Sequence, residues 1–224
     1  MKWKIDKEII VGVSGGPDSM YLLESLKNKF LTTPIAVHVN YKLRESAERD
    51  QKIVEEYCNK NNIDLYIFDE YDKFEKTNNL QESARNYRLD CFAKVSKITG
   101  VKRVALGHHK NDFIETAIMQ HEKSDNLLFY GIKKQNKIND LIIVRPLLNI
   151  YKNEIYNNLH KFEIPYGEDE SNKKEIYKRN QIRLSLEQKS EKDLDDIFFI
   201  EDMEPLELEP IEFDIEPIEM EELY

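Results

Sequence analysis

The sequence predicts an α/β fold, in which a doubly wound, mostly parallel five-stranded sheet carries helices on both faces. Two observations lead to this prediction. Short apolar runs alternate along the chain with segments of helical periodicity, and 224 residues with 40% hydrophobic content suit one well-cored domain. In such a sheet, ligands gather at the carboxyl ends of the strands.

Five apolar runs predict the strands, and apolar stripes predict the helices between them. The expected strands are residues 8–13, 34–39, 64–69, 103–107 and 141–146. The stripes of two helices are Leu22, Leu23, Leu26 and Phe30, and then Leu80, Ala84, Tyr87, Cys91, Val95 and Ile98. From residue 151 to about 190 the pattern is helical and polar, with a break at 164–172, so we expect a helical C-terminal part.

The net charge of −10 is distributed unevenly. Residues 191–224 hold 15 Asp and Glu against one Lys and carry −14, so residues 1–190 carry about +4. A mildly basic body is compatible with binding to phosphate backbones. We expect 1–190 to form the folded domain and 191–224 to be a flexible acidic tail, or alternatively a segment that folds back or docks a partner.

Composition also predicts the compartment. No apolar run approaches the roughly 20 residues that cross a bilayer, and the N-terminus lacks the apolar stretch of a secretory signal. We therefore expect a cytoplasmic protein with no membrane partner. Cys58 and Cys91 lack CxxC spacing and are expected to be reduced core thiols.

A glycine-rich turn, SGGPDS, follows the first expected strand at residues 14–19. Gly15 and Gly16 let backbone amides approach an anion closely, and the N-terminus of the next helix favours phosphate. An aspartate inside such a turn would repel a polyphosphate unless a cation stood between them, so Asp18 is a candidate Mg²⁺ ligand. The alternative is a structural turn with Asp18 capping the helix.

This turn resembles the SGGxDS signature of the PP-loop ATP pyrophosphatases. The resemblance implies that AMP is transferred from ATP to a carbonyl-type oxygen, and that the domain at 1–190 is catalytic. The residues implied to hold the pyrophosphate are Ser14, Gly15, Gly16, Pro17, Asp18 and Ser19.

Six further strings, in order along the chain, resemble the tRNA(Ile)-lysidine synthetase family. They occupy residues 38–44, 82–88, 107–116, 145–148, 165–172 and 179–183. The resemblance implies that ATP, with Mg²⁺, adenylates the cytidine at the first anticodon position of an isoleucine tRNA with a CAU anticodon. The side-chain amine of free lysine then displaces AMP and forms lysidine. Tyr41 and Gly107 depart from the family pattern, where histidine and alanine are usual.

Two acids three residues apart share one face at the start of a helix. Asp112 and Glu115 are candidates to hold the lysine ammonium or to deprotonate it, although acids at a helix N-terminus also favour its dipole. His108, just before them, is a further catalytic candidate. The resemblance adds Arg85 near the reacting nucleotide, with a surface ion pair to Glu82 as the alternative.

The remaining candidates would bind ATP or tRNA. His38 and Asn40 are placed to approach ATP from the end of the second strand, and Arg88 can bind phosphate bidentately. Lys42 and Arg44 follow the same strand and are otherwise solvated loop charges. The resemblance places a final group at the tRNA side and the mouth of the site: Arg145, Asp169, Ser171, Asn172, Arg179, Asn180 and Arg183.

Two other functions remain open from the sequence. One is another PP-loop adenylating enzyme, although the two isolated cysteines argue against thiolation. The other is a regulatory module that binds ATP without turning it over, which would need neither Asp112 nor Glu115.

Overall fold

The computed structural model describes residues 8–28, 32–43, 46–69, 80–123, 129–168, 182, 185–186, 189 and 192–194. These residues build a six-stranded sheet in the order β3-β2-β1-β4-β6-β5. The strands are β1 (Glu8–Gly12), β2 (Thr33–Asn40), β3 (Leu65–Asp69), β4 (Arg103–Ala105), β5 (Gln135–Ile138) and β6 (Leu141–Val144). The α/β fold with a mostly parallel sheet is therefore confirmed.

The number of strands was predicted wrongly, because the sheet has six and not five. The additional strand, β5, pairs antiparallel with β6 at the edge of the sheet. Its sequence, QNKI, is short and polar, since an edge strand does not need to be apolar on both faces. Asn139, with φ of 52°, stands in the two-residue connection to β6.

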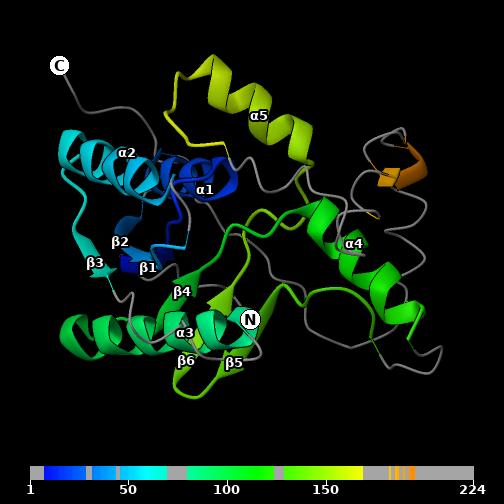
Figure 1. Cartoon of the computed structure of the whole chain (residues 1–224), viewed down its shortest axis with the longest axis horizontal. Helices are drawn as coiled ribbons and strands as arrows, with labels where there is room; N and C mark the ends of the chain where they lie inside the picture. The colour runs from blue at the N-terminus through cyan, green and yellow to red at the C-terminus, as the bar shows by residue number, and fades with distance from the viewer. Residues whose placement is uncertain are drawn as a thin grey trace, which may run out of the picture.

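Helices cover both faces of the sheet (Figure 1). Those along the described chain are α1 (Pro17–Asn28), α2 (Ala47–Lys60), α3 (Leu80–Thr99), α4 (Lys110–His121) and α5 (Lys152–Lys161). The first apolar cluster joins α1, α2 and α5 to one face, through residues such as Leu22, Val54 and Ile155. The second joins α3 to the other face, through Cys91, Phe92 and Val95.

A third apolar cluster lies beside the sheet and fixes α4. Phe113, Ile114 and Ala117 of this helix pack with Tyr130 and Leu148, and with three residues from the C-terminal part, Ile182, Leu186 and Leu194. Of the predicted acidic tail, 191–224, only residues 192–194 are described, and the rest lies outside the described residues. In the described part of the chain, no helix is both long and apolar enough to cross a bilayer.

The strand order creates a switch point between β1 and β4. From β1 the chain runs outward through β2 and β3, and then returns to place β4 on the other side of β1. The connections that leave β1 and β4 therefore run to opposite ends of the sheet. A crevice at the carboxyl ends of two such strands is where open α/β sheets bind ligands.

Candidate active site

The turn after β1 is held by its own hydroxyl groups. The Ser14 N–H donates to Ser19 Oγ at 3.1 Å, and Ser19 Oγ donates to the Gly16 carbonyl at 3.0 Å. Gly15 adopts φ of +87°, and a Cβ there would lie 2.7 Å from the Asp50 carbonyl oxygen of α2. The turn therefore needs glycine both for its conformation and for its close packing on α2.

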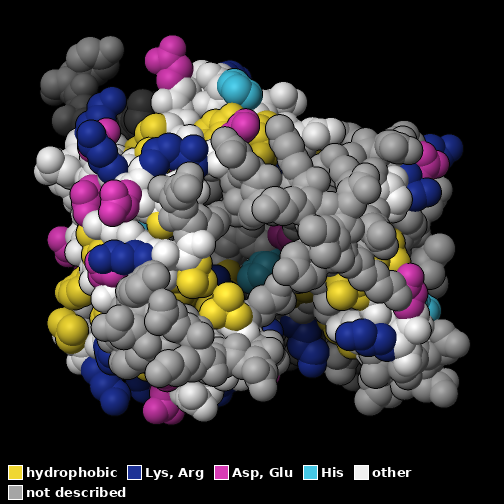
Figure 2. All heavy atoms as spheres, viewed as in Figure 1, with side chains coloured by type: hydrophobic (Ala, Val, Ile, Leu, Met, Phe, Trp, Pro, Cys, Tyr) yellow, Lys and Arg dark blue, Asp and Glu magenta, His cyan; other side chains and the backbone are white. Residues whose placement is uncertain are grey.

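A pocket of about 300 Å³ opens at the switch point. Figure 2 shows a hollow near the centre of the visible face, with a histidine side chain in it. The pocket is bounded by the turn on one side and by the end of β4 and the start of α4 on the other. Its lining residues are Gly12, Val13, Ser14, Gly16, Asp18, Ser19, Val37, Val39, Tyr41, Arg88, Leu106, Gly107, His108 and Asp112.

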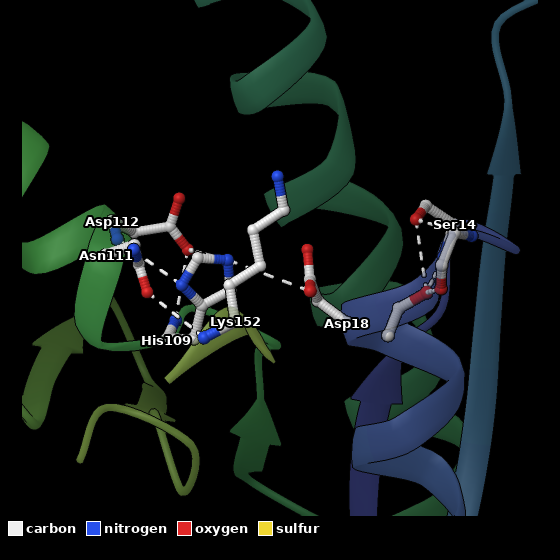
Figure 3. Close-up of polar contacts among 8 residues, drawn as sticks. Ser14, Asp18, His109, Asn111, Asp112 and Lys152 are labelled. Atoms are coloured by element: carbon white, nitrogen blue, oxygen red, sulfur yellow. Dashed lines mark hydrogen bonds and ion pairs between the residues drawn. The ribbon is translucent and has the colours of Figure 1, made fainter. Parts of the chain in front are cut away.

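Two carboxylates and an imidazole meet beside this pocket (Figure 3). His109 caps α4: its side chain accepts the Asp112 N–H at 3.4 Å, while Asp112 Oδ2 accepts the His109 N–H at 3.0 Å. His109 Nε2 lies 3.5 Å from Asp112 Oδ2 and 3.7 Å from Asp18 Oδ1. The SGGPDS turn and the acidic start of α4 are thus in one site.

Basic side chains gather at the other wall. The pKa of His108 is lowered to about 4, chiefly by burial and also by the nearby Arg145 and Arg88, while Asp112 opposes the shift. Burial, and then the neighbouring Arg85, lower the pKa of Arg145 to about 10. Neutral His108 and several guanidinium groups in one region favour an anion there.

Two buried nitrogens in this wall lack hydrogen-bond partners within the described ranges: His108 Nδ1 and Arg145 Nε. Arg145 is otherwise tied to the β5 edge, since its Nη1 donates to the Lys133 carbonyl and to Asn136 Oδ1, both at 2.7 Å. Buried polar atoms are normally paired, so these nitrogens are candidate ligand contacts.

Several predicted site residues do not line the pocket. Glu115 is only 1% exposed. His38 is buried with Nδ1 2.9 Å from the Val13 carbonyl, and burial lowers its pKa. Asn40 donates to Gln51 and accepts the N–H of Lys42, whose ammonium pairs with Asp69 at 2.7 Å.

The remaining predicted residues lie either on α3 or outside the described residues. Arg85 is exposed on α3, whereas Arg88, one turn later, lines the pocket. Those that lie outside the described residues are Arg44, Asp169, Ser171, Asn172, Arg179, Asn180 and Arg183. The roles of all these residues stay predictions.

The sequence analysis did not single out His109 or the apolar wall of the pocket. The sequence indicates only weakly that His109 is an N-cap. It precedes an expected helix, and an acid follows three residues later, which is the spacing of a capping box. The wall consists of Val37, Val39, Tyr41 and Leu106. Tyr41, a departure from the family pattern, joins β2 to α3, because its hydroxyl donates to the Ala84 carbonyl at 2.9 Å.

The residues present fit a magnesium ion bound mainly through phosphate. Among the residues that the structure describes, no group of three or more His, Cys, Asp or Glu could hold a metal ion. Asp18 lines the pocket at the phosphate-binding turn. Mg²⁺ characteristically takes one or two carboxylates and completes its shell with substrate phosphates and water.

The parallel sheet, its switch-point pocket and the glycine-rich turn define an α/β protein of the PP-loop class. The chain belongs to the PP-loop domain family, which matches residues 2–190.

The chain is similar to curated tRNA(Ile)-lysidine synthases. That of Mycoplasma genitalium is 42% identical over 182 residues, which are 81% of this chain and 62% of the relative. That of Ureaplasma parvum is 39% identical, over 80% of this chain and 54% of the relative. The chain therefore spans less than two thirds of the length of these relatives.

Solved structures with the same fold are more distant in sequence. The U34-tRNA thiolase NcsA of Methanococcus maripaludis has a TM-score of 0.67 at 18% identity, covering 85% of this chain and 69% of its own. The NMN synthetase of Francisella tularensis has a TM-score of 0.55 at 17% identity, covering 87% and 84%. These likenesses support the fold alone.

Proposed function

We propose that this chain catalyses lysidine formation on an isoleucine tRNA with a CAU anticodon, using ATP, Mg²⁺ and free lysine. One observation carries the proposal: a single pocket joins the PP-loop turn to Asp112. Similarity to tRNA(Ile)-lysidine synthases over about four fifths of the chain supplies the substrate class. The reaction belongs in the cytoplasm, where tRNA and ATP are available.

The first step is adenylation of the cytidine. The ring carbonyl oxygen attacks the α-phosphorus of ATP, the bond to the β-phosphate oxygen breaks, and pyrophosphate leaves. Amides and hydroxyls of Ser14, Gly16 and Ser19 bind the departing pyrophosphate, and the helix N-terminus of α1 stabilises its charge. Asp18 would hold Mg²⁺ beside the turn, and the ion would supply positive charge next to the phosphates.

Arg88 and the neighbouring basic wall serve the same step. Arg88 lines the pocket, and its guanidinium can donate two parallel hydrogen bonds to phosphate oxygens. The apolar wall next to it, which includes Val37, Val39 and Leu106, excludes water from the adenine side. The target base reaches this pocket by leaving the anticodon stack, which unpaired loop bases allow.

The second step joins lysine to the activated ring carbon. The lysine ammonium first gives up one proton to become an amine. The amine attacks that carbon, the bond to the AMP oxygen breaks, and the nitrogen loses its second proton to water as AMP leaves. Asp112 holds the incoming ammonium and receives the first proton, because it lies on the opposite side of the pocket from the turn. Glu115, buried one turn later on α4, supports the position of this helix face.

Stepwise product release tests the proposal. Pyrophosphate should be released only with the CAU tRNA, and AMP only when lysine is added as well. Asp18→Asn should abolish both signals, while Asp64→Asn, an exposed acid at the far end of β3, should leave them unchanged. If ATP binds but no pyrophosphate appears with any tRNA, the regulatory alternative is favoured instead.

The thiolation alternative receives no support from the cysteines. Cys58 lies in the apolar cluster of α1 and α2, and Cys91 in the cluster of α3, so the sheet separates them. Burial also raises the pKa of Cys58 to about 12, which keeps it in the unreactive thiol form.

A further inference from the structure

His109 is the side chain through which the two sides of the pocket meet. It is 3% exposed and stands between β4 and α4. Its Nε2 lies within 3.7 Å of Asp18, in the first turn of α1, and within 3.5 Å of Asp112, in the first turn of α4. Because β1 and β4 are paired neighbours, the two helices start close enough for one imidazole to contact both acids.

The capping box fixes which ring nitrogen carries the proton. Nδ1 accepts the Asp112 N–H, and a ring nitrogen that accepts a hydrogen bond has no hydrogen of its own. The ring hydrogen is therefore on Nε2, the nitrogen that faces both carboxylates. The Asp112 carboxylate accepts the main-chain N–H of His109, which completes the capping box.

We propose that His109 is a positioning residue whose Nε2–H, oriented by the capping box, keeps the Asp18 and Asp112 carboxylates in their working geometry. Two nearby carboxylates repel one another, and a donor that faces both reduces that repulsion and favours one arrangement. The link to catalysis rests on the proposed function, in which Asp18 serves adenylation and Asp112 serves lysine. His109 acts through these acids and does not line the pocket itself.

A pair of amide substitutions separates capping from positioning. In His109→Asn the amide oxygen takes the place of Nδ1, so it still caps α4 but cannot reach Asp18. In His109→Gln the amide nitrogen takes the place of Nε2, so it can face Asp18 but caps poorly. The matched control is His160→Asn, which makes the same change at an exposed imidazole on α5.

The kinetic result expected is a loss in the asparagine variant. With the full chain, kcat for both pyrophosphate and AMP release should fall roughly tenfold or more, which corresponds to about 1.4 kcal/mol, with an unchanged melting temperature. The glutamine variant should retain more of both rates. If the asparagine variant is fully active and the glutamine variant is not, His109 only caps the helix and the proposal fails.

The ring proton can be located without any turnover. The chain has five histidines, so long-range ¹H–¹⁵N spectra of ¹⁵N-histidine-labelled protein can be assigned with the His109→Asn variant. The expected spectrum shows the ring hydrogen on Nε2 and none on Nδ1. A proton on Nδ1 would overturn the proposal, even if lysidine formation is confirmed, and the Nε2 form would sustain it even if lysidine formation is not.

Discussion

Single side chains decide what the pocket can bind. Asp112 and Glu115, two acids of one helix, differ in burial and therefore in access to the pocket. Asp112 is 15% exposed and lines the pocket, whereas Glu115 is 1% exposed and does not. The sequence placed both on one face of α4 but could not distinguish them, because i and i+3 spacing does not report depth. Contact with free lysine is therefore expected from Asp112.

This assignment predicts different defects in two isosteric variants. Asp112→Asn should raise KM for lysine about tenfold or more, since a lost ammonium contact costs at least ~1.4 kcal/mol, with a smaller change in pyrophosphate release. Glu115→Gln should mainly lower the melting temperature. Steady-state kinetics and thermal unfolding of both variants check this, and a larger lysine KM defect in Glu115→Gln would reverse the assignment.

His108 predicts how stability depends on pH. Its folded pKa, about 4, is lowered chiefly by burial from the ordinary value of 6.5, so between these values the unfolded chain binds more protons. Stability from this group is therefore present above pH 6.5 and is lost as pH falls toward 4. The effect should be on the order of 1–2 kcal/mol after allowing for partial exposure.

Urea unfolding at pH 7 and pH 4.5 measures this contribution. The free energy of unfolding should fall more in the wild type than in His108→Asn, which has no titrating ring. Other titrating groups, including Asp112 beside it, are common to both proteins. Equal losses in the two proteins would show that His108 titrates normally.

At the scale of elements, the segment after α5 is attached to the phosphate-binding turn. The Gly167 N–H donates to the Gly15 carbonyl at 2.8 Å. Arg49 of α2 donates to the Glu168 carbonyl at 2.8 Å and also pairs with Asp50, which packs under the turn. Sequence analysis found residues 165–172 by resemblance, but this contact joins residues about 150 positions apart and leaves no local pattern.

Gly167→Ala tests this attachment. A Cβ at this position would overlap the Asp50 carboxylate and come within 2.9 Å of Arg49 Nη2. Overpacking of this kind costs about 1–3 kcal/mol, and displacement of the Gly15 carbonyl should raise KM for ATP. Glu168→Ala is the control, because the contact with Arg49 uses only the main-chain carbonyl of this residue. Equal ATP kinetics in both variants would show that this attachment does not affect ATP binding at the turn.

The elements themselves show where sequence reasoning succeeds. The five strands that the structure places inside the sheet or at the β3 edge have apolar runs with clear bounds, and the turn after β1 has a motif with a physical mechanism. β5 was missed because polar edge strands resemble loops. His38 and Asn40 were expected to approach ATP. The structure shows both side chains buried near the end of β2 and hydrogen-bonded to main-chain groups. The alternation of residues along a strand does not reveal which polar side chains make such bonds.

For the whole molecule, the doubly wound α/β fold was the most useful prediction, because in such a fold ligands bind at the carboxyl ends of the strands regardless of side-chain detail. The switch point between β1 and β4 gathers Ser14, Tyr41 and His108, from the segments that follow three strands, and Arg88 of α3 into one pocket. Residues 1–190 are mildly basic and residues 191–224 are strongly acidic. This difference in charge leads to a prediction about the proposed binding of tRNA.

Removing residues 195–224 should strengthen tRNA binding. This segment carries 13 acidic and no basic residues, and its repulsion of phosphate should weaken association at low salt. Leu194 must be kept because it is buried with Ile182 and Leu186. Filter binding at two salt concentrations should show a roughly threefold or greater gain at low salt that shrinks at high salt. An unchanged Kd at low salt would contradict a solvated tail.

The most direct test of the central claim is mass spectrometry of the anticodon after incubation of a CAU isoleucine tRNA with the chain, ATP, Mg²⁺ and lysine. The account predicts that the first anticodon cytidine gains the mass of one lysine less one water. The gain should be absent from methionine tRNA and from reactions with Asp18→Asn. Pyrophosphate release without that mass change, or with another acceptor modified instead, would contradict lysidine formation while leaving the ATP-binding turn in place.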